Sequence, residues 1–176
     1  MAGKSVVMEE SEIKTTLTRI AHEIVERNPE LKEVVFVGII TRGVPLARRL
    51  SKKIKSISEI SIPVGILDVT QHRDDLTKAK VVEDETKILF DIESKNVILI
   101  DDVIYHGRTV RAAMDALIHH GRPKSIQLAV LVDRGHREFP IHPDYVGRKI
   151  PTSSKEEVRL HVKELDDVDE VIVQVV

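Results

Sequence analysis

The chain has 176 residues, which suffices for one domain with a sizeable core over residues 1–176 and is too short for two ordinary domains. Its 29 acidic and 27 basic residues nearly cancel, so an anion-binding surface has to be a local patch rather than a property of the whole chain. Cysteine is absent and aromatic residues make up only 3%, which excludes disulfides, thiolate catalysis and zinc–cysteine sites and argues against a surface that stacks bases on aromatic rings.

The first predicted element is an amphipathic helix over residues 11–27. Ser11 is a suitable N-cap, and Asn28-Pro29 ends the helix because a proline disfavours helical backbone in the residue before it. An apolar stripe recurs at helical spacing: Ile13, Leu17, Ile20, Ala21 and Ile24. The opposite side is polar: Thr15, Thr18, Arg19, His22, Glu23, Glu26 and Arg27. Taken alone, this side is most simply a solvated face in which Arg19 and Arg27 pair with Glu23.

A buried strand from Val34 to Ile40 is predicted next, because its residues are almost all apolar and mostly β-branched. It leads into Thr41-Arg42-Gly43 and then into a helix from Val44 to about Ile54, whose first turn accommodates Pro45. Gly43 permits a tight turn, so that backbone N–H groups at this strand end can face an anion.

A further strand is predicted over residues 61–68, where Pro63 indicates an edge strand or an irregular start. The polar stretch after it, from Thr70 to about Asp84, has no clear periodicity. It is either a disordered insertion or a mobile lid, within a loop of about residues 70–90.

The most informative stretch runs from Val97 to Thr109. Its first four residues predict a strand buried on both faces, and Asp101 and Asp102 follow at the C-terminal end, where open α/β sheets bind their ligands. A loop with one glycine then leads into a helix whose N-terminus suits a phosphate, while Thr109 adds a hydroxyl donor and Arg108 a charge. The two carboxylates would repel a phosphate but suit ribose hydroxyls or a metal ion. This stretch therefore predicts a site for a sugar phosphate.

The remaining chain contributes one more buried strand, Ser125 to Val132, which ends in a polar cluster from Asp133 to Glu138. Its position beside the predicted ribose site makes this cluster the natural element for base recognition. The neighbouring His119 and His120 point about 100° apart on their helix and cannot chelate one ion, so we expect no metal held by the protein alone. Two strand-like runs, Val158–Val162 and Val171–Val176, flank an acidic turn.

The stretch 97–109 resembles the phosphoribosyl pyrophosphate (PRPP) loop of the type I phosphoribosyltransferases. In that family a hydrophobic strand is followed by two acidic residues and a short loop ending in Gly-x-Thr or Gly-x-Ser, here Asp101, Asp102, Gly107 and Thr109. The resemblance implies an α/β fold with a central, mostly parallel twisted sheet flanked by helices, a small hood and a flexible lid loop. It also implies Mg²⁺ bound together with PRPP, near the two acidic residues.

The resemblance also implies roles for individual residues. Asp101 and Asp102 would bind the ribose hydroxyls. The 5′-phosphate would be bound by Tyr105, His106, Gly107, Arg108 and Thr109, of which His106 stands where the family usually has threonine. Pyrophosphate would be bound by Thr41, Arg42, Gly43 and Arg73. The base would be contacted by Val132, Asp133, Arg134, Gly135 and His136.

Three other stretches, residues 17–23, 127–138 and 150–153, are similar to one subfamily, the bacterial regulators of pyrimidine-operon attenuation. These are RNA-binding proteins that are also uracil phosphoribosyltransferases. The similarity implies conversion of uracil and PRPP to UMP and pyrophosphate, and UMP- or UTP-promoted binding to the leader mRNA of pyrimidine biosynthetic operons by a homodimer or homotetramer. The implied RNA contacts are Thr18, Arg19, His22, Arg27, Arg148, Lys149 and Lys155.

Two alternatives remain at this point. A nucleobase salvage phosphoribosyltransferase without a regulatory role would keep the same active-site residues and leave the polar side of the 11–27 helix solvated. A regulator that only senses UMP would bind RNA without turning over PRPP. Because residues 1–8 lack the apolar run of a signal peptide and no stretch approaches a membrane span, we expect a cytoplasmic protein with no membrane partner.

Overall fold

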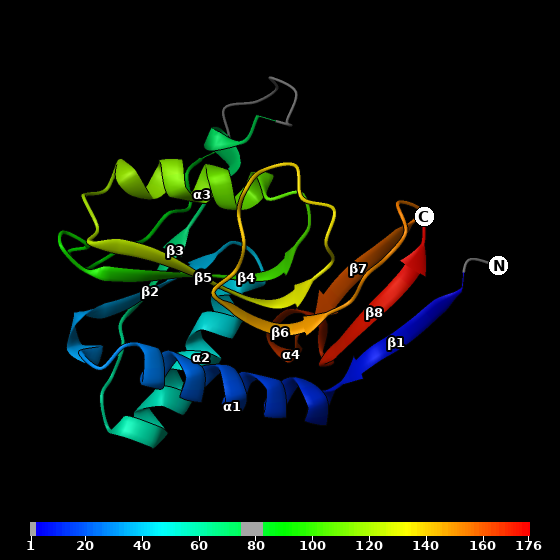
Figure 1. The fold of residues 1–176 in the computed structure, drawn as a ribbon, viewed down its shortest axis with the longest axis horizontal. Coiled ribbons are helices and arrows are strands. Elements are labelled where there is room, and N and C mark those ends of the chain that lie inside the picture. Colours follow the sequence, from blue (N-terminus) through cyan, green and yellow to red (C-terminus); the bar gives the residue numbers. More distant parts are fainter. Residues whose placement is uncertain (1–2, 75–82) are drawn as a thin grey trace.

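The computed structural model describes residues 3–74 and 83–176, and its centre is a five-stranded parallel sheet (Figure 1). The strands lie in the order β3-β2-β4-β5-β6. Their bounds are Val64–Leu67 for β3, Val34–Ile39 for β2, Asn96–Ile104 for β4, Ser125–Asp133 for β5 and Tyr145–Lys149 for β6. The predicted α/β class with a parallel sheet is confirmed, and the Pro63 strand does lie at an edge.

Helices cover both faces of this sheet. The helices α1 (Glu10–Arg27) and α2 (Gly43–Ser58) lie on one face, and α3 (Arg108–Ile118) lies on the other (Figure 1). Because side chains alternate along a strand, Ile98 and Ile100 of β4 join the apolar cluster under α1 and α2, whereas Leu99 joins the cluster under α3. The carboxyl ends of β2, β4 and β5 therefore meet at one edge of the sheet, between two packed layers.

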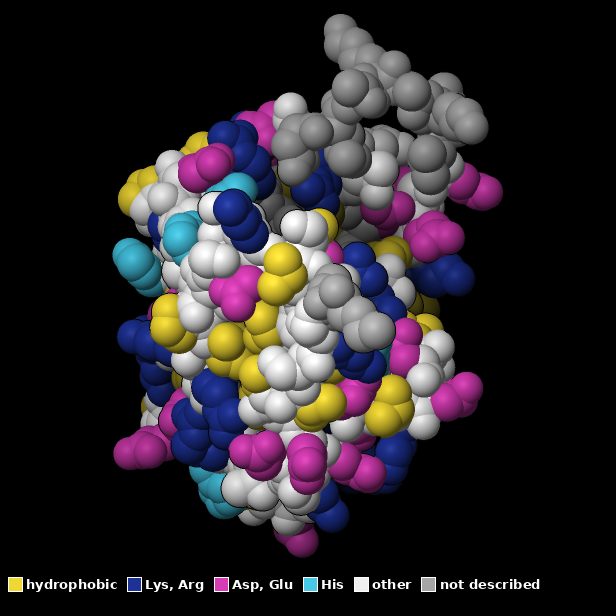
Figure 2. Space-filling model, turned by 90° about the vertical axis from the view of Figure 1, so that its right-hand side faces the viewer, with side chains coloured by type: hydrophobic (Ala, Val, Ile, Leu, Met, Phe, Trp, Pro, Cys, Tyr) yellow, Lys and Arg dark blue, Asp and Glu magenta, His cyan; other side chains and the backbone are white. Residues whose placement is uncertain are grey.

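A second, smaller sheet brings the two ends of the chain together. Its antiparallel strands have the order β1-β8-β7, with β1 at Lys4–Glu9, β8 at Glu170–Val175 and β7 at Glu156–His161. The short helix α4 (Lys163–Asp166) connects β7 to β8. The single-turn helices η1 and η2 span Leu31–Glu33 and Thr70–His72. This small sheet corresponds to the predicted hood. Figure 2 shows acidic and basic side chains intermixed on that side of the molecule.

The first helix differs from its prediction at both ends. It begins at Glu10, and Ser11 is not the N-cap: Glu9 ends β1 in extended backbone, and the Glu12 carboxylate accepts a hydrogen bond from the Glu9 N–H at 2.9 Å. The Arg19–Glu23 ion pair is confirmed at 2.7 Å. The Arg27 guanidinium instead pairs with Asp144 at 3.1 Å, because the loop before β6 passes the end of α1.

The bounds of other helices and strands differ from the predicted ones because tertiary contacts override local sequence patterns. The helix predicted to end near Ile54 continues to Ser58 and stops at Glu59 in left-handed backbone (φ 63°). The strands β1 and β6 were not predicted: β1 pairs with β8 at the far end of the chain, and β6 pairs with the preceding β5. The strand predicted to run to Val162 ends at His161, and Val162 is the N-cap of α4. Within residues 3–74 and 83–176, no helix combines the length and the apolar character needed to cross a membrane.

Candidate active site

The two adjacent carboxylates lie near the carboxyl end of β4. Asp101 is buried, with 7% of its surface exposed, and Asp102 is half-buried. Asp101 Oδ1 accepts a hydrogen bond from the Asp102 N–H at 2.9 Å, and Asp102 Oδ1 accepts one from the Val103 N–H at 2.7 Å. Burial, reinforced by the neighbouring charge of Asp102, raises the pKa of Asp101 well above its ordinary value. A cation beside Asp101 would therefore stabilise its ionised carboxylate, and a ligand hydroxyl would donate a hydrogen bond to it.

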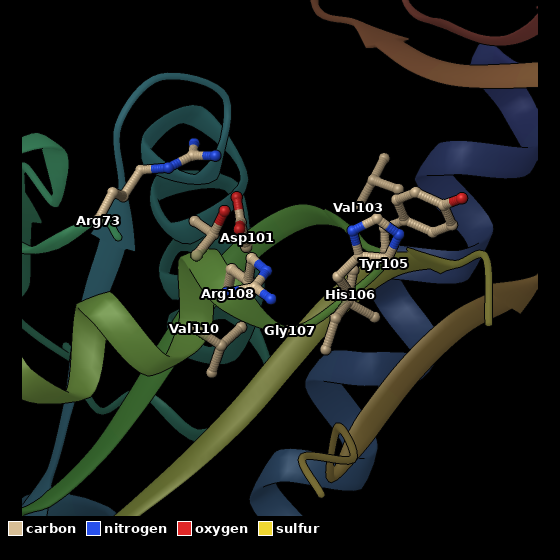
Figure 3. A pocket seen from close by; sticks show the side chains of 10 residues that line it. Arg73, Asp101, Val103, Tyr105, His106, Gly107, Arg108 and Val110 are labelled. Carbon is tan, nitrogen blue, oxygen red and sulfur yellow. The ribbon is translucent and has the colours of Figure 1, made fainter. Parts of the chain in front are cut away.

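The loop after these acids forms the floor of a cavity of about 240 Å³ (Figure 3). Gly107 precedes the first residue of α3 with φ 93°, a left-handed conformation that side chains disfavour. The first N–H groups of α3 have no partners inside the helix, so this end of the helix attracts anions. The cavity is lined by Arg73, Asp101, Val103, Ile104, Tyr105, His106, Gly107, Arg108, Thr109 and Val110. The structure thus gathers Asp101 and all five residues predicted for the 5′-phosphate around one space, whereas Asp102, also predicted for the ribose, does not line it.

Arg108 is less available for a phosphate than its position suggests. Its guanidinium donates to the Glu138 carboxylate at 2.7–2.8 Å and to Asp74 at 3.0 Å. Its charge is therefore already shared between two acids, and backbone N–H groups with the Thr109 hydroxyl are the better candidates for phosphate contact.

The turn predicted for pyrophosphate lies directly against β4. A methyl group added at Gly43 would collide with the carbonyl oxygen of Ile100 and would lie 3.3 Å from Asp101 Cα. The Arg42 guanidinium is held by the Asp166 carboxylate of α4, with donor–acceptor distances of 2.8 and 3.3 Å. Thr41 is exposed and lines a separate cavity of about 500 Å³. The turn is thus beside Asp101, but its arginine is turned toward the small sheet.

Arg73 reaches the site from the other side. It lies just after η2, lines the same cavity as Asp101, and points its guanidinium toward that carboxylate in Figure 3. The positive charge of Arg73 lowers the pKa of Asp101, but burial, which raises this pKa, has the larger effect. Residues 75–82, which make up much of the predicted lid loop, lie outside the described residues.

The predicted base-recognition cluster lines a neighbouring cavity of about 460 Å³. Four of its five residues face this cavity, together with four that were not predicted for the base: Asp133, Arg134, Gly135, His136, Arg137, His142, Lys149 and Pro151. Val132 does not line it, because its side chain is fully buried in the core under α1 and α2. Lys149, predicted for RNA, also lines this cavity.

Tyr105 lines the first cavity and contacts Arg134, which lines the second. The Arg134 guanidinium lies 3.8 Å from the centre of the Tyr105 ring, and the His106 ring stacks on the Tyr105 ring with 3.8 Å between ring centres. Arg134 is itself fixed by a hydrogen bond from Nε to Thr152 Oγ1 at 3.0 Å. The contact between the two cavity linings is therefore preorganised.

Arg137, which the sequence analysis gave no role, joins both cavities. Its guanidinium donates to the Asp133 carboxylate at 2.7 Å, to the Tyr105 carbonyl at 2.9 Å and to the Ile141 carbonyl at 2.8 Å. Burial pushes the pKa of Asp133 upward, but the hydrogen bonds from Arg137 and from the Gly135 N–H outweigh it and hold that pKa below its ordinary value. Its only sequence signal was its place in the polar cluster after β5.

The residues predicted for RNA are mostly occupied by partners within the chain. Arg19 donates to the carbonyls of Val146 and Gly147 at 3.0 and 2.6 Å, in addition to its pair with Glu23. Arg148 donates to the Val7 carbonyl and to Glu12. Thr18 is half-buried, whereas His22 and Lys155 are exposed.

No protein cage for a metal is found within the described residues, where no three histidine, aspartate or glutamate side chains converge. The donor set nevertheless suits Mg²⁺ bound mainly through a substrate, because this ion takes one or two carboxylates together with phosphate oxygens. The elevated pKa of Asp101 points the same way, since a divalent cation would stabilise its ionised form.

Comparison with known proteins identifies the class first. The profile of the phosphoribosyl transferase domain matches residues 8–165. A hypoxanthine-guanine phosphoribosyltransferase from Bacillus anthracis superimposes with a TM-score of 0.73 at 22% identity, covering 97% of each chain. Hypoxanthine phosphoribosyltransferase from Trypanosoma cruzi gives a TM-score of 0.77 at 19% identity, covering 98% of this chain and 95% of the other. These structures share the fold.

Relatives at higher sequence identity define a subgroup within this family. "Bifunctional protein PyrR" from Pelotomaculum thermopropionicum is 54% identical over 97% of this chain and 95% of the relative. The protein of the same name from Clostridium novyi is 51% identical over 97% of each chain. The chain therefore belongs to the phosphoribosyltransferase family and, within it, to the bifunctional PyrR proteins.

Proposed function

We propose that this protein converts uracil and PRPP to UMP and pyrophosphate and that it also regulates pyrimidine biosynthetic operons by nucleotide-dependent binding to their leader mRNA. The observation that carries the proposal is the pair of cavities linked by the contact between Tyr105 of the first and Arg134 of the second, one cavity suited to a ribose phosphate and the other to a base. The word "bifunctional" in the names of relatives at 51–54% identity favours it over a salvage enzyme without a regulatory role.

The reaction breaks the bond between ribose C1 and a pyrophosphate oxygen and forms a bond from C1 to uracil N1, while the proton on N1 is released to solvent. Positive charge develops on the ribose as the leaving group departs, so no protein nucleophile is required, and positioning with neutralisation of the leaving group carries the catalysis. In this proposal Asp101 and Asp102 bind the ribose hydroxyls, and the N–H groups and hydroxyl at the start of α3 bind the 5′-phosphate.

Pyrophosphate would lie between the Gly43 turn and Arg73, which flank Asp101 from opposite sides. Mg²⁺, bound through PRPP oxygens beside Asp101 and Asp102, would neutralise the charge of the departing pyrophosphate. Arg42 would join this site after exchanging its Asp166 partner for the substrate.

The second cavity would hold uracil. Its bounding side chains are fixed by Arg137 and by the His136 ring, whose Nε2 lies 2.6 Å from the Thr152 carbonyl oxygen. UMP would fill both cavities at once, because it carries the base and the 5′-phosphate but no pyrophosphate. The product of the reaction is therefore suited to act as the regulatory ligand.

A structural connection supports coupling between UMP and RNA. Lys149 lines the base cavity and ends β6, while Arg19 of α1 donates to two β6 carbonyls, those of Val146 and Gly147. Ordering of β6 by a bound nucleotide would thereby steady the helix that carries the proposed RNA contacts.

Two measurements on the wild-type protein test the two activities. In the first, uracil and PRPP are incubated with Mg²⁺ and UMP formation is followed, with Asp102→Asn as the variant. We expect a loss of about 10²-fold, because the amide cannot provide the charge and the hydrogen bonds that the carboxylate offers to the ribose. A folded variant with wild-type turnover would remove Asp102 from the proposed site.

In the second, filter binding is titrated with a pyrimidine-operon leader RNA and with a shuffled RNA of the same composition, each with and without UMP. The proposal expects UMP to strengthen binding to the leader selectively. Binding that ignores both UMP and sequence would leave a salvage enzyme, and RNA binding without any UMP formation would leave a nucleotide sensor.

A further inference from the structure

The described structure contains a groove lined by lysines that lies beside the proposed RNA contacts. It runs between α1 and α2, which lie next to each other in Figure 1, and encloses about 360 Å³. Its lining residues are Glu10, Lys14, Leu17, Arg49, Lys52, Lys53, Ser56 and Asp169. None of them belongs to either cavity of the proposed active site.

The acids of this groove already have cationic partners within the chain. Asp169 pairs with Arg49 at 2.7 Å, and Glu10 pairs with Lys163. Arg49 also pairs with Glu164, so one guanidinium serves two carboxylates and this arginine has no charge to spare. The acids and the arginine of the groove are thus already engaged.

The three lysines, by contrast, have no carboxylate within ion-pair distance in the part of the chain that the structure describes: Lys14, Lys52 and Lys53. Among the described residues, Lys53 Nζ donates one hydrogen bond, to the hydroxyl of Thr18 at 2.9 Å, and that hydroxyl donates to the Lys14 carbonyl at 3.0 Å. Burial, together with the like charges of Lys14 and Arg49, lowers the pKa of Lys53. Crowded ammonium groups without counter-charges favour an anion between them.

The location of the groove suggests which anion this is. Thr18, one of the residues proposed to contact RNA, forms its edge through the bond to Lys53. The arginines proposed for RNA are engaged within the chain, Arg19 by Glu23 and carbonyls, Arg27 by Asp144 and Arg148 by Glu12. RNA affinity depends on cations that neutralise phosphates, and the lysines of the groove are cations next to this face that have no carboxylate partner among the described residues.

We propose that the groove formed by Lys14, Lys52 and Lys53 binds backbone phosphates of the RNA, extending the contact surface from the exposed side of α1 across to α2. This inference rests on the proposed RNA-binding function and adds a set of phosphate contacts to it. Because these contacts go to the backbone, they raise affinity without selecting the sequence.

The test compares two double variants that remove the same charge. The groove variant is Lys14→Gln/Lys52→Gln, whose side chains are exposed and make no hydrogen bond within the described residues that the substitutions would break. The control is Lys32→Gln/Lys55→Gln, on η1 and on α2, where neither lysine lines the groove. Binding to the leader RNA in the presence of UMP is measured from 0.1 M to 1 M salt, and thermal unfolding checks that both variants are folded.

We expect the groove variant alone to lose affinity. For single-stranded nucleic acid each phosphate contact contributes about 0.7 to the slope of log K against log salt, so two lost contacts lower the slope by about 1.4 and the affinity at 0.1 M salt by about 25-fold. The control should keep the wild-type slope.

Three other results would overturn the inference. A groove variant with the wild-type slope and affinity rejects the groove while leaving the RNA-binding function intact. An equal loss in the control assigns the effect to net charge. Failure of the wild-type protein to bind the leader at any salt concentration rejects the RNA-binding function and the groove with it.

Discussion

The contact between the Gly43 turn and β4 gives the sharpest prediction, because it links the proposed pyrophosphate and ribose positions through backbone atoms alone. In Gly43→Ala the new methyl group would meet the Ile100 carbonyl oxygen well inside contact distance, and would lie 3.2 Å from the carbonyl carbon and 3.3 Å from Asp101 Cα. Since carbon–oxygen contacts in proteins lie at roughly 3.3–3.6 Å, the turn and the strand must separate by roughly 1 Å.

No flexible side chain can absorb this displacement, because every atom that the methyl group meets is backbone. Overpacking of this kind costs about 1–3 kcal/mol of folding stability. A displacement of about 1 Å between groups that hold one substrate can also lower the rate by about 10²-fold. We therefore expect Gly43→Ala to remain folded but to lose about 10²-fold in kcat/KM for PRPP, measured at saturating uracil with Mg²⁺.

Gly147→Ala is the matched control for stability. A methyl group there would meet the carbonyl oxygen of Leu131, between β6 and β5, and also the Thr16 side chain at 2.8 Å, and none of these contacts involves the Gly43 turn. We expect the two variants to lose similar stability in thermal unfolding, while only Gly43→Ala loses most of its kcat/KM for PRPP. Wild-type kinetics in Gly43→Ala, or an equal kinetic loss in Gly147→Ala, would refute the idea that this contact aligns the substrate.

Two further predictions concern the titratable groups of the site. The raised pKa of Asp101 means that its protonated form favours folding at low pH and that this stability is lost as pH rises through the raised value. Asp101→Asn should therefore melt above the wild type at pH 7, by about 2 °C or more if the gain is about 1 kcal/mol, with the difference closing as the pH falls toward 4. A constant difference across that range would contradict the burial effect. Arg137→Ala should raise KM for both PRPP and uracil and destabilise the fold by about 2 kcal/mol, because it leaves the largely buried Asp133 carboxylate without its cation. Asp133 has a lowered pKa, so the stability from this pair is present above the ordinary aspartate pKa and is lost as pH falls through the lowered one. Arg137→Lys keeps the positive charge but cannot donate to all three acceptors, so it should restore part of the stability without restoring both KM values. Unchanged KM values in Arg137→Ala would show that Arg137 does not position the site.

Local sequence patterns were sufficient for the centre of this protein. The strand, the two carboxylates, the glycine turn and the helix start of residues 97–109 are neighbours in the chain, so a short segment carries their whole geometry. Local patterns were also sufficient to predict the apolar stripe along α1 and the buried strands β2 and β5. Burial of these strands on both faces left little choice but a parallel sheet covered by helices.

Other features depended on segments far apart in the sequence. The strand β1 is defined by pairing with β8, so that Lys4 faces Gln174, and no turn near it announces a partner. The partner of Arg42 is Asp166, and the acceptors of Arg19 are carbonyls of β6, so charges that looked available in the sequence are engaged in the fold.

The sequence by itself determined the fold class, the acidic pair and the glycine loop that leads into α3, because hydrophobic periodicity and a contiguous motif specify them locally. Only the tertiary structure decided which cationic side chains remain available to a ligand. Lys14 and Lys53 are separated by 39 positions, yet two packed helices bring them to one groove, while the arginines among the predicted RNA contacts are engaged by acids and backbone carbonyls of the same chain. Electrostatic availability depends on distances in space, which a pattern of residue types along one chain does not contain.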